Sequence, residues 1–206
     1  MNNQEIILAA HDVWRTEAMG LEQLCQTVDD NAFCDVVRLI AHCTGKIIVS
    51  GCGTSGEAAR KIAHSLCCVE RPACFLSPSA AAHGGLGILQ KEDVFILLSK
   101  GGNTHELLGL ADACKTKGAV MVAVTEDPAS LLAQRADRLL LVKVPREPCP
   151  FNMLATASTM AVIGVFDAAC IALMELTGYT REQFLVIHPG GAVGEKLANT
   201  NREAMD

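Results

Sequence analysis

Aromatic and charged residues are both scarce in this 206-residue chain, and each shortage excludes a class of protein. Aromatic residues make up 4% of the chain, which leaves few rings on which nucleic-acid bases could stack. Charged residues make up 19%, the formal net charge is −6, and the sequence contains no cluster of Lys and Arg. Because nucleic acids are bound through basic surfaces, we expect no nucleic-acid partner.

Paired cysteine motifs are also missing, although the chain contains ten cysteines. No two cysteines have the CxxC spacing of zinc and redox sites, and the first 17 residues carry charges where a secretory leader would be apolar. We therefore expect a cytoplasmic protein whose reduced thiols pack as small core residues. Cys52, His83 and His188 are conceivable zinc ligands, but they lack close spacing, so we expect neither a metal nor a cofactor.

The chain has one long apolar stretch, from Leu154 to Leu176, and this stretch is not purely hydrophobic. It is rich in Ala, Thr, Ser and Gly and contains Asp167 and Glu175. A buried or interface helix explains these residues better than a membrane span, so no membrane partner is expected. Because half of all residues are hydrophobic, we also expect a subunit interface.

The pattern of apolar residues predicts a single domain over residues 1–206. N-terminal helices are expected within 1–44, an α/β core within 45–198, and a tail at 199–206. Five short runs that are apolar at nearly every position indicate buried parallel strands, at 46–51, 73–77, 94–101, 119–126 and 138–145. Helical segments alternate with them at about 55–70, 104–117, 128–136 and 155–177. The fold class is therefore α/β, as a three-layer α/β/α sandwich with a five-stranded parallel sheet.

Two loops rich in glycine and hydroxyl residues follow the first and third strand runs. They read GCGTSG at 51–56 and SKGGNTHE at 99–106, and each opens a helix. Glycines let the backbone approach an oxyanion, while amides at a helix start and Ser or Thr hydroxyls complete its shell. The expected contacts are the side chains of Ser55, Ser99 and Thr104 and the backbone amides of Gly53, Gly101 and Gly102.

Each of these loops by itself could equally be a tight turn with an N-capping hydroxyl. The first loop has G-x-G-x-x-G spacing, but no acidic residue closes the second strand run, as a dinucleotide-binding unit requires. A GxxxxGK[ST] loop is absent, which disfavours a nucleotide triphosphatase. Two such loops together favour a small phosphorylated ligand.

These loops and three later motifs resemble the sugar isomerase (SIS) domain from about Gly45 to Leu197. SPSAAAHGGLG at 77–87, EPCPFNMLATAST at 147–159 and HPGGAVGEKL at 188–197 are similar to the arabinose-5-phosphate isomerase branch. The resemblance implies a flavodoxin- or Rossmann-like sheet, a phosphosugar ligand, and a homodimer or homotetramer whose subunits share active sites. In that branch a pair of CBS domains usually follows, and this chain is expected to lack them.

The resemblance also implies roles for individual residues. Glu147 matches an active-site glutamate that could move a proton, His188 the histidine of HPGG, and His83 that of the AxHGxLG loop. From the residues alone, Glu147 could instead pair with Arg146 in solvent, and His188 could simply cap a helix. The start of the last long helix could bring Thr156 and Ser158 near the pocket.

Two departures from the family pattern imply an altered active site. Thr54 stands where the first loop commonly carries lysine, and Asn103 stands where the second loop commonly carries an acidic residue. Lys100, which directly follows Ser99, could supply the cation that Thr54 does not provide. Thr54, Lys100 and Asn103 are therefore included among the expected substrate-binding residues.

Three functions remain open at this stage. The first is an aldose–ketose isomerase of a phosphosugar, with altered substrate preference. The second is a non-catalytic phosphosugar-binding protein, which the residues at 54 and 103 favour. The third, a phosphoheptose isomerase-like enzyme, fits the GGNT loop but not the HPGG and EPCP motifs.

Overall fold

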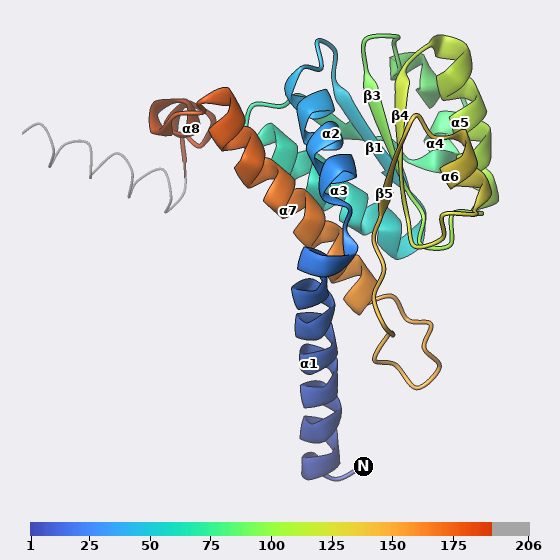
Figure 1. The fold of residues 1–206 in the computed structure, drawn as a ribbon, viewed down its shortest axis with the longest axis vertical. Helices are drawn as coiled ribbons and strands as arrows, with labels where there is room; N and C mark the ends of the chain where they lie inside the picture. The colour runs from blue at the N-terminus through green and yellow to red at the C-terminus, as the bar shows by residue number, and fades with distance from the viewer. Residues whose placement is uncertain (191–206) are drawn as a thin grey trace, which may run out of the picture.

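The computed structural model describes residues 1–190 of the chain, and these form a parallel sheet covered by helices (Figure 1). The strands are β1 (Ile47–Gly51), β2 (Ala73–Phe75), β3 (Val94–Leu98), β4 (Val120–Thr125) and β5 (Arg138–Leu141). They pair in parallel in the order β2-β1-β3-β4-β5. The predicted five-stranded α/β/α sandwich is confirmed.

The central strands are mostly apolar because both of their faces are covered. Every residue of β1 and β3 is buried. Successive side chains point to opposite faces, so Ile47 and Val49 join one core while Ile48 joins the other. This is the physical reason that the strand runs show no polar alternation.

Helices of different length cover the two faces (Figure 1). One face carries α2 (Asp30–Ala41), α3 (Gly53–Cys67) and α7 (Ala157–Thr177), with α1 (Asn3–Thr27) packed along α7. The other face carries α4 (Pro78–Ala82), the 3₁₀ turn η1 (Gly85–Ile88), α5 (His105–Lys117) and α6 (Leu131–Arg135). The N-terminal part of α1 extends beyond the rest of the molecule, and α8 (Arg181–Ile187) follows the far end of α7 (Figure 1).

Several predicted bounds were wrong, mostly where a strand run continues into a loop. β3 ends at Leu98 rather than at 101, since Ser99 to Thr104 form a loop, and β2 and β5 end at Phe75 and Leu141. The expected N-terminal helical region consists of two helices. Asp29 Oδ1 accepts a hydrogen bond from Ala32 N (2.8 Å) and so caps the start of the second helix, α2. The short elements α4, η1 and α8 were not predicted. The expected tail at 199–206 and the end of the core near 198 lie outside the described residues.

The long apolar helix expected near 155–177 is α7, which begins at Ala157. Within residues 1–190, α7 is the one helix that is long and apolar enough to cross a membrane, judged by length and composition alone. It packs against α1, α2 and α3, and Ala161, Phe166 and Leu173 are buried in the core. Its apolar composition is thus explained in part by burial inside the domain.

The strand order brings the two glycine-rich loops together. β1 pairs with β3 so that Gly51 lies opposite Leu98, which places the loops that follow them side by side. The helix after β1 covers one face of the sheet and the helix after β3 covers the other. In open α/β sheets, ligands bind in the crevice between two neighbouring strands whose following helices cover opposite faces. The candidate site lies in this crevice, between the loops after β1 and β3.

Candidate active site

The second loop is organised by the hydroxyl of Ser99. Gly102 N donates to Ser99 Oγ (3.1 Å), and Ser99 Oγ lies 2.8 Å from Thr104 Oγ1. Gly102 has φ +65°, and a Cβ there would lie 2.0 Å from Ser130 Oγ. A side chain at Gly102 would therefore disturb both the backbone and its neighbour. The structure thus brings Ser99, Gly102 and Thr104 of the second loop together.

Asn103 and Lys100 tie this loop to the next strand and helix. Asn103 Oδ1 accepts from Leu131 N (3.0 Å), and Asn103 Nδ2 donates to Gly101 O (3.1 Å). The carbonyl of Lys100 accepts from Thr125 Oγ1 (2.8 Å). Asn103 thus shapes the loop with both polar ends of its side chain, while Gly101 is exposed with open space around it.

The first loop is a close turn of backbone at the start of α3. A Cβ at Gly51 would lie 2.8 Å from the backbone of Ser55, and one at Gly56 would lie 2.7 Å from Gly51 O. Gly53 has φ +53°, which glycine adopts without strain. Thr54 is exposed and Ser55 is half-buried. The backbone therefore packs closely against itself where α3 begins.

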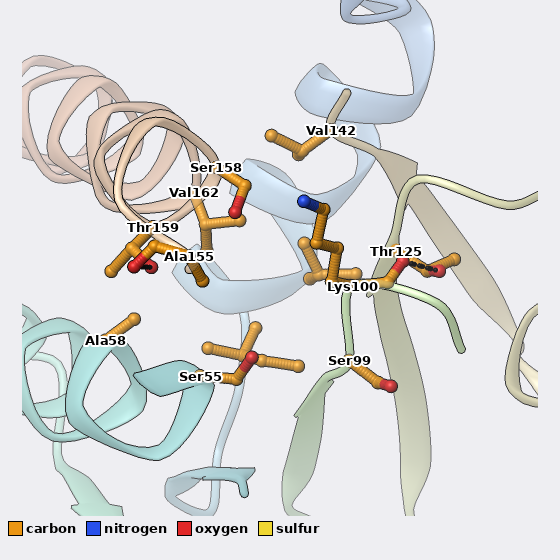
Figure 2. A pocket seen from close by; sticks show the side chains of 12 residues that line it. Ser55, Ala58, Ser99, Lys100, Thr125, Val142, Ala155, Ser158, Thr159 and Val162 are labelled. Atoms are coloured by element: carbon orange, nitrogen blue, oxygen red, sulfur yellow. Dashed lines mark hydrogen bonds between the residues drawn. The ribbon is translucent and has the colours of Figure 1, made fainter. Parts of the chain in front are cut away.

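Polar groups from both loops and from α7 line one small pocket (Figure 2). It has a volume of about 30 Å³, and its polar lining includes Ser55, Ser99, Lys100, Ser158 and Thr159. Apart from Thr125 the remainder of the lining is apolar, with Ala58, Val142 and Val162 among the side chains shown in Figure 2. Hydroxyls and one ammonium group thus converge within a largely apolar surrounding.

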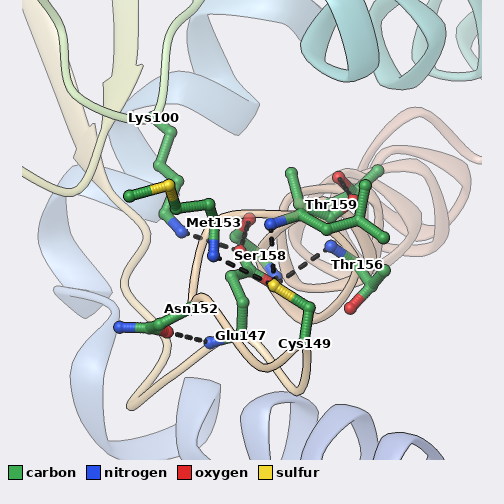
Figure 3. Close-up of polar contacts among 10 residues, drawn as sticks. Lys100, Glu147, Cys149, Asn152, Met153, Thr156, Ser158 and Thr159 are labelled. Carbon is green, nitrogen blue, oxygen red and sulfur yellow. Dashed lines mark hydrogen bonds and ion pairs between the residues drawn. The ribbon is translucent and has the colours of Figure 1, made fainter.

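Glu147 lies in the loop after β5 with its side chain almost fully buried, and four donors surround its carboxylate (Figure 3). Oε1 accepts from Lys100 Nζ (2.7 Å) and from Ser158 Oγ. Oε2 accepts from the backbone amides of Thr156 (3.0 Å) and Ser158 (3.4 Å). Pairing with Arg146, the alternative considered from the sequence, was wrong, because Arg146 Nη2 instead contacts Asp12 Oδ1 (2.6 Å).

This environment strongly favours the ionised form of Glu147. Burial by itself raises the pKa of a carboxyl group. Here the hydrogen bonds from Lys100, Ser158 and Thr156, with the charge of Lys100, outweigh burial and lower the pKa of Glu147 to about 2. Glu147 is therefore a carboxylate at neutral pH, and a weak base while these donors remain in place.

The loop that carries Glu147 is held by contacts that sequence reasoning missed. Glu147 N donates to Asn152 Oδ1 (2.7 Å), and Asn152 has φ +55°. Cys149 Sγ accepts from the amides of Met153 and Leu154 (3.1 Å each), and these bonds lower the pKa of its thiol. The thiols were expected to pack mostly in the core, but within residues 1–190 only Cys114 and Cys170 are buried, and Cys149 is a half-exposed loop residue. The signal available was its position between Pro148 and Pro150.

His83 does not line the pocket that contains Ser55 and Ser99. It lines a second cleft beside the first loop, which is larger and more open than that pocket. This cleft has a volume of about 910 Å³, and its lining includes Gly53, His83 and His105. His83 is exposed and follows the last residue of α4. Arg60, which also lines the cleft, stacks over the Phe75 ring at 4.0 Å from its centroid. The predicted pocket-lining position of His83 matches this cleft, next to the first loop rather than beside Glu147.

His188 is not brought to these loops within one chain. It is the residue after α8, its Nδ1 lies 3.0 Å from Phe184 O, and its ring stacks on Phe184 at 3.9 Å. Tyr179 Oη donates to Cys68 O (3.3 Å), at the end of α3 that lies away from the glycine-rich loops. Figure 1 likewise shows α8 at the opposite end of α7 from the loop after β5. His188 thus ends a helix, the simpler of the two interpretations.

Comparison with known families gives a clear match. The model of the family described as SIS domain matches residues 39–172. This chain belongs to the SIS domain family.

Curated SIS relatives include the arabinose 5-phosphate isomerase KdsD of Yersinia pestis, 35% identical over 189 residues, and that of Salmonella typhi, 37% identical over 189 residues. In each case the match covers 92% of this chain but 57% of the relative. The chain therefore spans little more than half the length of these relatives.

Two solved SIS structures resemble the chain over their whole length. A Listeria monocytogenes protein, provisionally described as a sugar-phosphate isomerase, is 56% identical with a TM-score of 0.91. An Escherichia coli CFT073 protein solved in complex with arabinose 5-phosphate is 31% identical with a TM-score of 0.87. Each match covers 92% of this chain and 100% of the other chain.

The SIS fold of this chain thus gathers most of the predicted residues at one edge of its sheet. Ser55, Ser99 and Lys100 line one pocket, and Lys100 reaches Glu147. His83 lines the neighbouring cleft, while His188 lies elsewhere in the chain. Among residues 1–190 no three His, Cys, Asp or Glu side chains are grouped so that they could hold a metal ion.

Proposed function

We propose that this SIS chain is an aldose–ketose isomerase that acts on a small sugar phosphate and has an altered active site. The named relatives are arabinose 5-phosphate isomerases, and a solved structure of the same fold holds arabinose 5-phosphate. The observation that carries the proposal is the buried Glu147 carboxylate, which contacts a lysine of the second glycine-rich loop at 2.7 Å. An ionised acid–base group thus lies directly beside the expected phosphate site.

The phosphate is proposed to bind between the two loops. Ser55 and Ser99 line the same pocket, and Thr104 lies at hydrogen-bond distance from Ser99. The amides of Gly53 and Gly101 would complete the shell, because amides at the start of α3 and in the second loop can bind an oxyanion. The amide of Gly102, also expected to bind, would first have to give up its hydrogen bond to Ser99 Oγ. Neutral donors of this kind bind a dianion without requiring net positive charge on the protein.

Glu147 is proposed to carry the proton between the two reacting carbons. Its carboxylate would take the proton from C2 of the aldose while the carbonyl at C1 becomes an enediolate oxygen. The same carboxyl group would return the proton to C1. A second proton would move from the C2 hydroxyl to the oxygen on C1, and the product is the ketose. The hydroxyl of Ser158 already donates to Glu147 Oε1 and would keep the carboxylate oriented toward the substrate.

The two family departures support an altered preference rather than a lost site. Thr54 is exposed at the first turn of α3, and Asn103 is engaged in loop hydrogen bonds. Lys100 supplies a cation within the pocket, as proposed from the sequence. These replacements would change which sugar is accepted while keeping a cation beside the phosphate loops.

His83 and His188 remain proposed catalytic residues, and His188 requires a second subunit. Within one chain His188 follows α8, which lies at the opposite end of α7 from the loop after β5 (Figure 1). A homodimer or homotetramer would let the His188 of one chain approach the loops of another. The exposed apolar side chains of Ile6, Ile7 and Trp14 on α1 support such an assembly. A cytoplasmic location is likewise proposed.

The test is a screen of pentose, hexose and heptose phosphates for aldose–ketose interconversion, monitored by NMR. Glu147→Gln should lower kcat by at least about 100-fold, because it removes the general base. Glu92→Gln, a change at an exposed glutamate, is the matched control and should retain full activity. Turnover that survives Glu147→Gln would contradict the catalytic assignment.

A second candidate function is phosphosugar binding without turnover. The observation that favours it is the tight engagement of Glu147 with four donors, which leaves it weakly basic. Calorimetric binding of a phosphosugar together with no interconversion in any of the three sugar classes would support this function. Preferential turnover of a heptose phosphate would instead favour the phosphoheptose isomerase-like alternative.

A further inference from the structure

Lys100 belongs by sequence to one feature of the site and by contact to another. Its neighbour Ser99 is part of the loop proposed to bind phosphate, and both line the same pocket (Figure 2). Its ammonium nevertheless lies 2.7 Å from Glu147 Oε1, on the loop after β5 (Figure 3). The same cation is therefore within the reach of both the phosphate site and the proposed base.

We propose that Lys100 couples phosphate binding to the action of Glu147. In the free protein the ammonium is paired with the carboxylate, and a phosphosugar dianion bound between Ser55 and Ser99 draws it away. Glu147 is then released to act as the base. The inference rests on the phosphosugar site of the proposed function and adds to it the way in which that site is switched on.

Lys100 can leave Glu147 for the phosphate because the lysine side chain is free to move, whereas the glutamate side chain is held in place. The side chain of Glu147 is fully buried and is held by Ser158 Oγ and two backbone amides besides Lys100. The side chain of Lys100 is 34% exposed, and a single hydrogen bond joins it to the carboxylate. Lysine is a point charge on a flexible stem, so its ammonium can change partner while its backbone stays fixed.

The charges favour the exchange when a dianion is present. A phosphate dianion carries twice the charge of the carboxylate and would lie in the same pocket as the lysine stem. After the ammonium leaves, the carboxylate keeps its neutral donors and its position. It loses the one charged group among those that lower its pKa.

The pKa of Glu147 is set by opposing effects of its surroundings, and these predict how it changes when Lys100 leaves. Burial raises its pKa, and the contributions of Lys100, Ser158 and Thr156 lower it. Without Lys100 the effect of burial gains weight, so the pKa rises and the carboxylate becomes a better base. The other charged groups nearby do not replace Lys100, because Arg146 is paired with Asp12 of α1.

The experiment measures Glu147 directly, without turnover. The full chain is labelled with glutamate carrying ¹³C in its carboxyl group, and the Glu147 signal is assigned by its loss in Glu147→Gln. Its titration is followed with and without sulfate, which is a dianion in the part of the pH range where a raised pKa of Glu147 would be measured and takes up a proton only near the lowest pH. We expect sulfate to raise the pKa of Glu147 by at least about one unit in the wild-type protein.

Lys100→Met is the decisive variant, with thermal unfolding as the check that it folds. Its Glu147 should have the raised pKa already in the absence of sulfate and show no further rise on addition. Lys100→Arg keeps the charge and should restore the response to sulfate at least in part. A wild-type Glu147 signal that does not respond to sulfate would overturn the inference, and so would a Lys100→Met signal that still responds to it.

Kinetics then separate this inference from the proposed function. If a phosphosugar is turned over, Lys100→Met should raise KM by at least about 10-fold and change kcat by less, because the variant loses phosphate binding but not the base. Turnover with an unresponsive Glu147 signal would overturn the inference alone. A responsive signal without any turnover would support the coupling and contradict isomerase activity.

Discussion

Lys46 and Asp93 are joined by two hydrogen bonds at the amino ends of neighbouring strands. Lys46 Nζ donates to Asp93 Oδ2 (2.8 Å), and Lys46 N donates to Asp93 Oδ1 (2.9 Å). Gln90 N adds a third donor at 2.8 Å, and the carboxylate is buried. Burial raises the pKa of Asp93, but the hydrogen bonds from Lys46 and Gln90 outweigh it, so the pKa is lowered.

The first prediction concerns this carboxylate. Asp93→Asn should lower the free energy of unfolding by roughly 2–3 kcal/mol at pH 7, since hydrogen bonds to a charged group are lost. Because the folded pKa lies below the unfolded one, the contribution is present above the ordinary range of Asp and disappears as the pH falls through the folded pKa. Urea unfolding of both proteins from pH 7 to pH 3 should show the difference narrowing. Glu92→Gln, at the adjacent exposed position, should change the free energy by less than about 0.5 kcal/mol.

The second prediction compares two adjacent glycines of the second loop. Gly102→Ala should destabilise the protein by more than about 1 kcal/mol, because the left-handed φ of +65° is unfavourable for alanine and its Cβ would meet Ser130 Oγ. At Gly101 a Cβ would have no neighbour within 4 Å, so Gly101→Ala is the matched control. Thermal unfolding of the two variants measures the difference. Equal stability of the two would contradict the described loop geometry.

The third prediction concerns Ser99. Ser99→Ala removes the acceptor of Gly102 N and the partner of Thr104, so both loop order and phosphate binding should weaken. We expect the Kd for a phosphosugar to rise by about 10-fold or more, since one net hydrogen bond is of the order of 1 kcal/mol and the loop loses its shape as well. Titration calorimetry provides the measurement. Unchanged affinity would place the phosphate away from this loop.

The fourth prediction concerns the thiol of Cys149. Amide donors from Leu154 and Met153 lower its pKa, whereas burial raises the pKa of the Cys114 thiol to about 12 and that of Cys170 to about 11. Since the thiolate is the reactive form, iodoacetamide at pH 7 should modify Cys149 well before Cys114 and Cys170. Peptide mass spectrometry at increasing reaction times gives the order. Simultaneous modification of all three would contradict the loop structure around Cys149.

The layers of the fold and the position of both loops were predictable, because they depend on residues close together in the chain. The runs that became β1 and β3 are apolar at consecutive positions, which only a sheet covered on both faces requires. The turns at Gly51 to Gly56 and Ser99 to Thr104 carry the glycines and hydroxyls that their backbone geometry uses. Strand ends were less predictable, since Leu76 follows β2 and Val142 follows β5 as further apolar residues outside the strands.

The contacts of the site were decided by tertiary structure, because their partners lie far apart in sequence. Nothing in the residues near Glu147 shows that Lys100, 47 positions earlier, is its cation, or that Arg146 turns to Asp12. Strand order brings the loops after β3 and β5 to one edge of the sheet, and the length of α7 carries His188 away from it. Local sequence therefore determined which chemical groups are present at the strand ends. Packing of distant segments determined which of those groups meet, because side-chain contact depends on position in space.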